Sequence, residues 1–305
     1  MTLACTNYAN QYLTNKGLPP SAALDTTAAK IHGTATIPFT YTDHNATYHH
    51  ATIDCTYKKG HATGTIHDNT TPTKTSTPEG MTYHNSVDWL PGLQKPRSIF
   101  PGAEIKNIDQ SFYCSAGYLA ENTNHELYIL TAGHCGKPGD RFAIYEQHST
   151  NYTVIGYMAD TQVRYQDPEE KLIAANDIGL IKITTPVWQS SHIPVKNTAF
   201  KGTMTAQQAL DKGLSVCHLG RTTGFSCGNI IDSDNGGFRF WGLSDRGDSG
   251  GPIFAMDNNK NYWAIGVSSA VDDLAKTRPW GWEINDYMHK NNLHIAPELN
   301  TSPNQ

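Results

Sequence analysis

Three short segments of the chain carry side chains that together are suited to nucleophilic catalysis. His134 lies in "LYILTAGHCG", where an apolar run ends in a turn of small residues, and Asp177 lies in "AANDIGLIKI", directly before another apolar run. Ser249 lies in "RGDSGGP", among three glycines. A serine hydroxyl is a poor nucleophile at neutral pH unless a base such as histidine takes its proton, and a buried carboxylate can hold that histidine in the correct tautomer.

Taken one at a time, these residues have ordinary structural explanations. A histidine at the end of a strand is more often structural or exposed, and an aspartate before a strand is more often a cap. A Gly/Asp/Ser/Pro cluster is typical of a tight turn, because glycine permits positive φ and Asp and Ser bond to nearby backbone groups. The catalytic interpretation therefore rests on finding all three in one chain, in the order His, Asp, Ser.

The elements that must position these residues are mainly short strands. Runs such as "LYILTAG", "DIGLIKI" and "YWAIGVSS" are separated by turn signals, which is typical of an all-β barrel or sandwich. Near the end of the chain, Ile284, Tyr287 and Met288 have the spacing of a single closing helix.

Residues 1–67 are expected to form a separate small α+β domain. Cys5, Tyr8, Tyr12 and Leu13 have helical spacing. The segments "AKIHGTATIPFTYT" and "TYHHATIDCTY" then alternate in period two, as half-buried strands do.

Residues 68–98 are expected to form a linker. The segment opens with the polar, Thr/Pro-rich run "DNTTPTKTSTPEG" and continues into the irregular, Pro-punctuated run "DWLPGLQKPRS". Residues 99–305 would then form the β domain that carries the candidate catalytic residues.

The six cysteines fall along the chain as three sequential pairs: Cys5 and Cys55, Cys114 and Cys135, Cys217 and Cys227. Six cysteines permit fifteen connectivities, so the count alone does not choose among them. An even count without a CxxC spacing fits an oxidising compartment better than metal or redox work. A Cys5–Cys55 bond would join the first helix to the last strand of its small domain.

Composition and charge exclude several classes of protein. The formal charge of −5 over 305 residues leaves no basic footprint for nucleic acid. No apolar run approaches the roughly 20 residues that a membrane span needs. The opening "MTLACTNYAN" lacks the basic and apolar regions of a signal peptide, so we expect any export signal to be missing from this sequence.

The three catalytic segments resemble the motifs of the trypsin/chymotrypsin-like serine proteases, in particular the bacterial secreted branch of α-lytic protease and the streptogrisins. "VCHLGRTTGFSCGNI" resembles a disulfide-bridged hairpin of that branch, and "IFPGAEI" resembles the start of a mature chain. The resemblance covers residues 99–290 and implies a mainly β fold, a double six-stranded β-barrel with the active site between the barrels. It implies a secreted serine endopeptidase that acts through an acyl-enzyme on Ser249.

The resemblance also implies roles for neighbouring residues. Cys114–Cys135 would be the bridge beside the catalytic histidine, and Cys217–Cys227 the hairpin bridge. The backbone N–H groups of Gly247 and Ser249 would form an oxyanion hole, because glycine has no side chain to prevent its N–H from facing the substrate.

The partner of Asp248, whose carboxylate is usually buried in this family, stays open. In a one-chain form it would be His218 or Arg221. If a zymogen were cleaved after Ser98, the new N-terminal amine of Ile99 would pair with Asp248 instead.

Five residues would form the substrate pocket by the same resemblance: Leu243, Ser244, Ser269, Ala270 and Val271. Leu243 stands where trypsin-like members carry an aspartate, and Val271 would narrow the entrance. We therefore predict cleavage after small or medium apolar P1 residues. The nearby acids Asp245, Asp272 and Asp273 would favour basic P1 residues instead, if they faced the pocket.

A metal site is not expected. His49 and His50 are adjacent in a predicted strand and so point to opposite faces, and no spacing fits a closed zinc site. The enzyme would need no organic cofactor, would act on proteins or peptides, and would be a monomer.

The rival interpretation of the β domain is a catalytically dormant protease-like scaffold used for binding or adhesion. The small N-terminal domain has three interpretations: a pro-segment, a targeting or binding module, or a structural brace. The family resemblance favours the pro-segment.

Overall fold

The chain forms two compact units, Met1–Ser76 and Thr77–Gln305. The computed structural model describes residues 2–15, 22–24, 33–42, 48–58, 61–67, 80–86, 88–146, 151–165, 174–271 and 276–296. Over these ranges, no helix has both the length and the apolar character needed to cross a bilayer.

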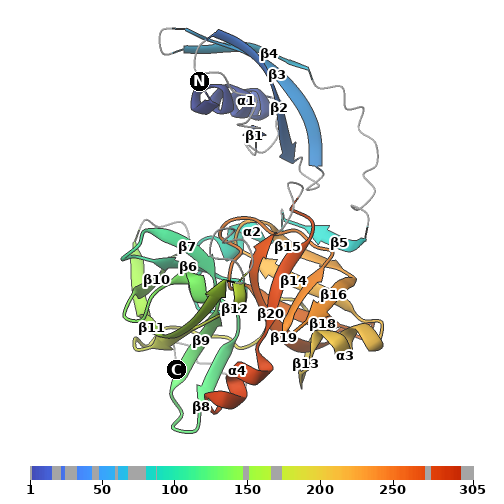
Figure 1. The fold of residues 1–305 in the computed structure, drawn as a ribbon. Helices are drawn as coiled ribbons and strands as arrows, with labels where there is room; N and C mark the ends of the chain where they lie inside the picture. The colour runs from blue at the N-terminus through green and yellow to red at the C-terminus, as the bar shows by residue number, and fades with distance from the viewer. Residues whose placement is uncertain are drawn as a thin grey trace. The chain divides into compact units, whose positions relative to one another are not determined.

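The first unit consists of one helix and a four-stranded antiparallel sheet with the order β1-β2-β3-β4 (Figure 1). Its elements are α1 (Thr2–Asn15), β1 (Ala23–Leu24), β2 (Gly33–Thr42), β3 (Tyr48–Lys58) and β4 (His61–His67). Cys5, Ala9 and Leu13 recur every four residues and are fully buried, so α1 has one apolar face. The Cys5–Cys55 disulfide joins this face to β3. In the chain-entropy model, a cross-link across 50 residues stabilises the fold by about 4 kcal/mol.

The sheet of the first unit has the period-two alternation that its sequence predicts. Ile37 and Phe39 of β2 are buried, as are Ile53 and Cys55 of β3. Residues at alternate positions of a strand share one face, so these side chains and the apolar face of α1 form one core. A helix on one face of a sheet is the α+β arrangement expected for this part of the chain.

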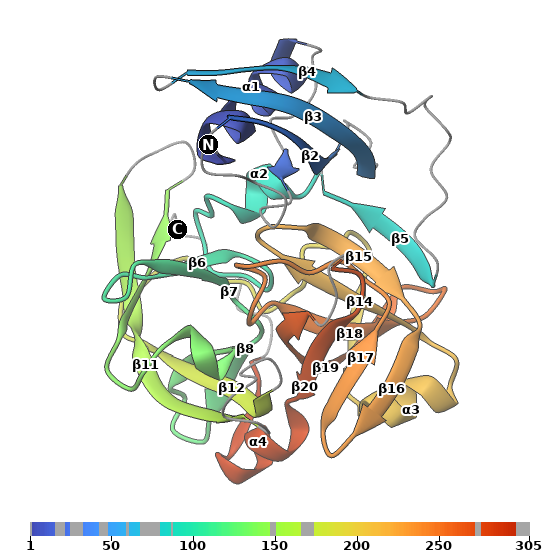
Figure 2. The same cartoon turned by 45° about the horizontal axis from the view of Figure 1, so that its top comes forward.

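The first barrel of the second unit, drawn mainly in green in Figure 1, is closed by six strands. Its elements are β6 (Glu104–Asn107), β7 (Phe112–Ser115), β8 (Leu119–Asn122), β9 (Leu127–Thr131), β10 (Arg141–Tyr145), β11 (Tyr152–Tyr165) and β12 (Ala174–Ile183). The strand order runs β8-β9-β12-β11-β10-β6-β7. Since β7 and β8 follow each other along the chain with only three residues between them, they act as one bent strand, and the sheet returns to its start. Figure 2 shows β11 and β12 side by side in this barrel.

The second barrel, in orange, repeats this topology. Its elements are β14 (Ser215–Gly220), β15 (Gly224–Gly228), β16 (Ile230–Asp234), β17 (Gly237–Phe240), β18 (Pro252–Met256), β19 (Asn261–Val271) and β20 (Pro279–Glu283). The order β16-β17-β20-β19-β18-β14-β15 closes because only Asn229 separates β15 from β16. Two six-stranded barrels of one topology confirm the predicted double β-barrel of the chymotrypsin-like type.

A shared apolar cluster joins the two barrels. It includes Leu130 and Ile178 of the first barrel and Ala264 and Val267 of the second. The buried hydroxyl of Tyr118 also donates to the carbonyl of Ile253 across the junction, at 2.5 Å. The barrels are therefore held in a fixed relation, as a site built from both of them requires.

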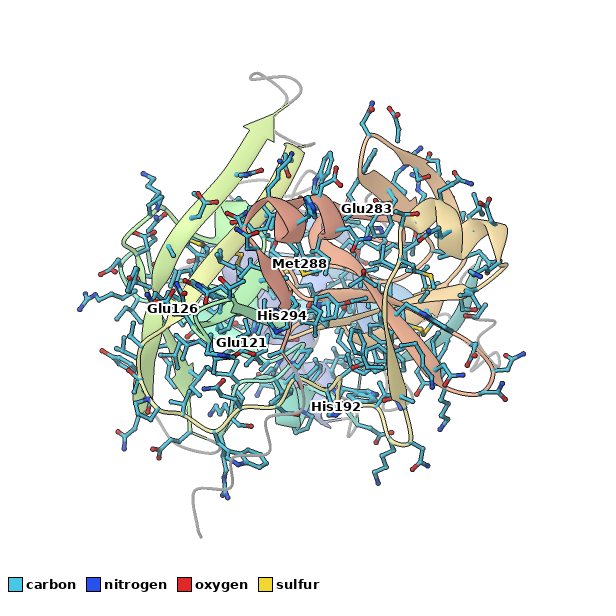
Figure 3. All side chains as sticks on the ribbon, turned by 90° about the horizontal axis from the view of Figure 1, so that it is seen from below. Glu121, Glu126, His192, Glu283, Met288 and His294 are labelled. Carbon is cyan, nitrogen blue, oxygen red and sulfur yellow. A yellow bond between two sulfur atoms is a disulfide. The ribbon has the colours of Figure 1, made fainter. Side chains whose placement is uncertain are left out.

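Further short elements lie outside the closed barrels. They are α2 (Leu90–Leu93), α3 (Ala206–Asp211), α4 (Asn285–Lys290), β5 (Met81–Asn85), β13 (Ala199–Thr203) and β21 (Leu293–Ile295). The predicted closing helix corresponds to α4, with Ile284 directly before it and Tyr287 and Met288 buried in the shared cluster. After α4, β21 pairs with β8, and His294 lies beside Glu121 with 3.4 Å between Nε2 and Oε2 (Figure 3).

The expected linker covered residues 68–98, but part of this range belongs to the second barrel. Residues 81–85 form β5, which pairs with β15 and adds an edge strand to that barrel. Leu93 of α2 is buried against the same barrel. Pairing with β15 and a few buried side chains hold this segment in place. It therefore needs no long apolar pattern of its own, and its sequence shows no strand signal. Residues 68–79 lie outside the described part of the chain.

Candidate active site

His134 lies in a tight turn at the end of a buried strand of the first barrel. Strand β9 leads into the 3₁₀ turn Gly133–Cys135, whose neighbours leave little space. A Cβ at Gly133 would lie 2.7 Å from the carbonyl oxygen of Gln162, so this turn requires glycine. The Cys114–Cys135 disulfide fixes the residue after the histidine. The His134 side chain is still 34% exposed, so a substrate can reach it.

Asp177 accepts hydrogen bonds from His134 at two places. Its Oδ2 lies 2.7 Å from the imidazole Nδ1, and its Oδ1 accepts the His134 backbone N–H at 2.8 Å. The Ser269 hydroxyl donates to Oδ2 at 2.5 Å. The carboxylate is fully buried, and the paired contacts fix both the position and the orientation of the imidazole ring.

The charges of this pair shift both of their pKa values. Burial alone would raise the pKa of Asp177, but the neighbouring His134 and the hydrogen bonds to the carboxylate lower it below its ordinary value. Burial alone would lower the pKa of His134, but the charge and hydrogen bond of Asp177 raise it above its ordinary value. The carboxylate thus stabilises the imidazolium form that a general base must pass through.

Ser249 is contributed by the second barrel, in the turn that leads into β18. Its Oγ lies 2.9 Å from Nε2 of His134 and 3.3 Å from the carbonyl oxygen of Ser269. With Nδ1 donating to Asp177, Nε2 of the neutral ring is left as the acceptor for the serine proton. The structure therefore brings His134, Asp177 and Ser249 into one continuous line of hydrogen bonds.

Two backbone N–H groups beside Ser249 have no acceptor within the described residues. They belong to Gly247 and to Ser249 itself, whereas their neighbours Asp248 and Gly250 donate to carbonyl groups. Gly247 has φ +100°, a conformation that favours glycine. A pair of unused donors beside a nucleophile is the arrangement that stabilises a developing oxyanion.

Asp248 is fully buried, and neither predicted one-chain partner holds its carboxylate. The carboxylate instead accepts from the N–H groups of Thr222, Thr223 and Asp245 and from the Thr223 hydroxyl, at 2.7–3.2 Å. A carboxylate with this many donors needs no cation beside it.

In the continuous chain, none of the three candidates considered bonds to the Asp248 carboxylate. The Arg221 guanidinium pairs with Glu104. His218 is fully buried, and within the described residues neither of its ring nitrogens bonds to the Asp248 carboxylate. Burial lowers the pKa of His218, and the nearby charge of Asp248 opposes this shift only in part. In the continuous chain, the N–H of Ile99 donates to the carbonyl oxygen of Trp188 at 2.9 Å.

The predicted pocket residues lie on two segments beside Ser249. Leu243 and Ser244 are buried, whereas Ala270 and Val271 at the end of β19 are partly exposed. The Ser269 hydroxyl donates to Asp177, and the Ser269 carbonyl oxygen lies 3.3 Å from Ser249 Oγ. Of the three nearby acids, Asp245 forms an ion pair with Lys276, and Asp272 and Asp273 lie outside the described residues.

The cysteines form the three disulfides Cys5–Cys55, Cys114–Cys135 and Cys217–Cys227. Cys114, His134 and Cys135 are the one group in the described ranges whose ligand atoms are close enough to hold a metal ion. Because both thiols are used in a disulfide, this group offers no thiolate ligands. His49 and His50 lie on β3, and their side chains are outside the described part of the structure.

Sequence reasoning missed the polar residues that support the Ser249 turn. Ser115, Thr222 and Thr223 all bond to this turn, and Glu104 removes Arg221 from the choice of partners for Asp248. A single Ser or Thr at a strand end or in a hairpin turn gives no signal of its own in the sequence. Only the topology that brings β6, β7 and the β14–β15 hairpin together identifies them.

Comparisons with known proteins give these similarities. No protein-family model matches the chain. Uncharacterized proteins from two strains of Mycobacterium tuberculosis are 29% identical over 182 residues, which is 58% of this chain and 75% of theirs. Among solved structures, the Nocardiopsis protease is 22% identical with a TM-score of 0.47, over 65% of this chain and 99% of that one. The protease Anisep from Arthrobacter nicotinovorans is 13% identical with a TM-score of 0.40, over 65% and 98%.

Proposed function

We propose that this chain is a serine endopeptidase of the trypsin/chymotrypsin-like type, which hydrolyses peptide bonds through an acyl-enzyme on Ser249. The observation that carries this proposal is the line of hydrogen bonds from Asp177 through His134 to Ser249, with distances of 2.7 and 2.9 Å. The two unused N–H groups beside the nucleophile give it further support.

The reaction follows from these contacts. Nε2 of His134 takes the Ser249 proton as Oγ forms a bond to the carbonyl carbon of the substrate, and the carbonyl electron pair moves onto its oxygen. The N–H groups of Gly247 and Ser249 stabilise that negative oxygen. When the C–N bond breaks, the imidazolium gives its proton to the leaving amine. Water, activated by the same histidine, then hydrolyses the ester and frees Ser249.

The dormant-scaffold alternative receives no support from this geometry. A scaffold that has lost its activity has no need for a nucleophile, a base and an orienting carboxylate in mutual contact. The buried Asp177 in particular would be costly to keep without the histidine that its charge stabilises.

Small or medium apolar P1 residues are the proposed substrate class. By the family resemblance, Leu243 takes the position of the charged residue at the base of a trypsin-like pocket, and its side chain is buried. Asp245 already pairs with Lys276, which supports an apolar P1 preference. On a panel of peptides that differ only at P1, we expect the highest kcat/KM after Ala, Val or Leu. Preferred cleavage after Arg or Lys would contradict this assignment while leaving the reaction type intact.

The setting of the enzyme is proposed from its disulfides and its first unit. Three disulfides favour an extracellular location, because the cytosol keeps thiols reduced. We propose that the enzyme is secreted as a monomer and acts on proteins or peptides. The small α+β unit is proposed to be a pro-segment that cleavage before Ile99 would remove.

A covalent label tests the proposed function directly. The purified chain is treated with a fluorophosphonate and weighed intact, with Ser249→Ala beside it. We expect a single adduct on the wild-type protein and none on the variant, since only an activated serine attacks this reagent. The starting mass also tells whether residues 1–98 have been removed. Absence of an adduct on a chain that begins at Ile99 would refute the enzyme assignment.

A further inference from the structure

The peptide groups on both sides of Gly247 are held by side-chain hydroxyls. Thr222 Oγ1 donates to the carbonyl oxygen of Arg246 at 2.8 Å, and Ser115 Oγ donates to the carbonyl oxygen of Gly247 at 2.9 Å. Neither hydroxyl touches the triad. Both act on the short segment that carries one of the two proposed oxyanion donors.

The bond from Thr222 fixes the direction of the Gly247 N–H. In a planar trans peptide the C=O of one residue and the N–H of the next point in opposite directions. Anchoring the Arg246 carbonyl on one side therefore turns the Gly247 N–H to the other side, where it has no acceptor within the described chain. Glycine restricts φ and ψ very little, so this peptide would rotate readily without an anchor.

Arg221 directs both hydroxyls. Its guanidinium Nη1 donates to Thr222 Oγ1 at 3.2 Å, and its backbone N–H donates to Ser115 Oγ at 3.0 Å. A hydroxyl that accepts one N–H is left to donate its own proton elsewhere. For Thr222 and Ser115, the acceptors are the two carbonyl groups that flank the Gly247 N–H.

Arg221 itself is held rigidly. Its Nε donates to Oε2 of the buried Glu104 at 2.7 Å, and its guanidinium lies 5.1 Å from the ring centre of Tyr113. The contact with Gly247 is close as well. A Cβ on that glycine would lie 2.7 Å from Thr222 Oγ1 and 3.1 Å from Arg221 Nη1.

We propose that Thr222 and Ser115 are positioning residues whose hydroxyls, directed by the guanidinium and the backbone N–H of Arg221, keep the Gly247 N–H aimed at the oxyanion. This inference rests on the proposed function. Its consequence is that the anchors stabilise the transition state and leave the binding of the ground-state substrate unchanged.

Thr222→Val tests the proposal, because it removes the hydroxyl and keeps the shape. Complete loss of one oxyanion donor costs about 10²–10³ in kcat, and a freed peptide would still point correctly part of the time. We therefore expect kcat to fall by about 10-fold to 100-fold, with KM within about twofold of wild type. Affinity for a peptide boronate should fall by the same factor as kcat. Thr222→Ser should restore both.

A matched control and a second variant keep the test decisive. Thr198→Val removes a hydroxyl that donates to the carbonyl of Val195, away from the site, and should leave kcat unchanged. If Thr222→Val does not fold, Ser115→Ala removes the second anchor by deleting one oxygen atom and should lower kcat with KM unchanged.

Two results would overturn the inference. One is Thr222→Val with wild-type kcat and boronate affinity, and the other is Thr222→Ser impaired as much as Thr222→Val. Failure of the proposed function would appear differently, as a wild-type protein without any turnover that depends on Ser249.

Discussion

Ser249→Ala is expected to lower kcat by about 10⁶, the loss seen when the nucleophile of a serine protease triad is removed. That factor corresponds to about 8 kcal/mol of transition-state stabilisation. The loss is large because His134 and Asp177 contribute to the chemistry only by taking and stabilising the proton of Ser249. Without the Oγ, which lies 2.9 Å from Nε2, the base has no proton to take.

The measurement is the steady-state hydrolysis of the best peptide from the P1 panel. KM should change little, since the Oγ makes no contact that binds the ground state. Ser233→Ala is the matched control, because it removes a hydroxyl on β16 that bonds to the exposed Gln207 side chain, and it should retain wild-type kcat. A Ser249→Ala protein that keeps more than a tenth of wild-type kcat would rule out the acyl-enzyme mechanism.

The candidate catalytic residues could be located from the sequence because each stands in a short segment with a characteristic pattern. His134 follows an apolar strand and precedes a cysteine, and Ser249 lies among glycines that its turn requires. Part of the second barrel could also be predicted, because "VCHLGRTTGFSCGNI" contains a whole hairpin, which the structure shows as β14 and β15. Each of these local structures is determined by a few consecutive residues.

Contacts between distant segments could not be predicted in the same way. Arg221 was a reasonable partner for Asp248 by position, but Glu104 on β6 of the other barrel binds it instead. Whether Arg221 pairs with Asp248 or with Glu104 depends on which edges of the two barrels meet, and no local sequence pattern indicates this. Strand β5 was missed for a similar reason, since Met81–Asn85 pair with β15, which lies far away in the sequence.

Ser269 lies in a recognisable local pattern and also makes a contact with a distant segment. Its place in "GVSSAV" assigned it to the wall of the predicted substrate pocket, and this segment forms the end of β19. The structure commits its hydroxyl to Asp177, 92 positions earlier in the chain, at 2.5 Å. The carboxylate is therefore held from both barrels, by His134 from the first and by Ser269 from the second.

Asp177→Asn should lower kcat by about 10⁴ near neutral pH, while the fold is retained. An amide can accept only through its one oxygen, and its NH₂ group would donate to Nδ1 of His134. That bond favours the tautomer with the proton on Nε2, which cannot accept the Ser249 proton. The remaining activity would come from the oxyanion donors and from substrate binding.

The pH profile gives this variant a second, independent readout. In the wild type, activity needs the neutral imidazole, and Asp177 raises the pKa of His134 above its ordinary value of 6.5. Activity should therefore rise with pH through an apparent pKa above 6.5. Without the carboxylate, burial remains as the main influence and lowers that pKa. The acidic limb of kcat/KM in Asp177→Asn should move to lower pH even as the plateau falls.

Asp109→Asn is the control for both readouts. Asp109 also has a pKa lowered by its hydrogen bonds, in this case to Arg141, but it lies on the surface of the first barrel. Its loss should change neither kcat nor the acidic limb. If Asp177→Asn lowered kcat with an unshifted limb, the carboxylate would only orient the imidazole. A shifted limb means that its charge also stabilises the imidazolium, which is the stronger role that the buried pair of hydrogen bonds predicts.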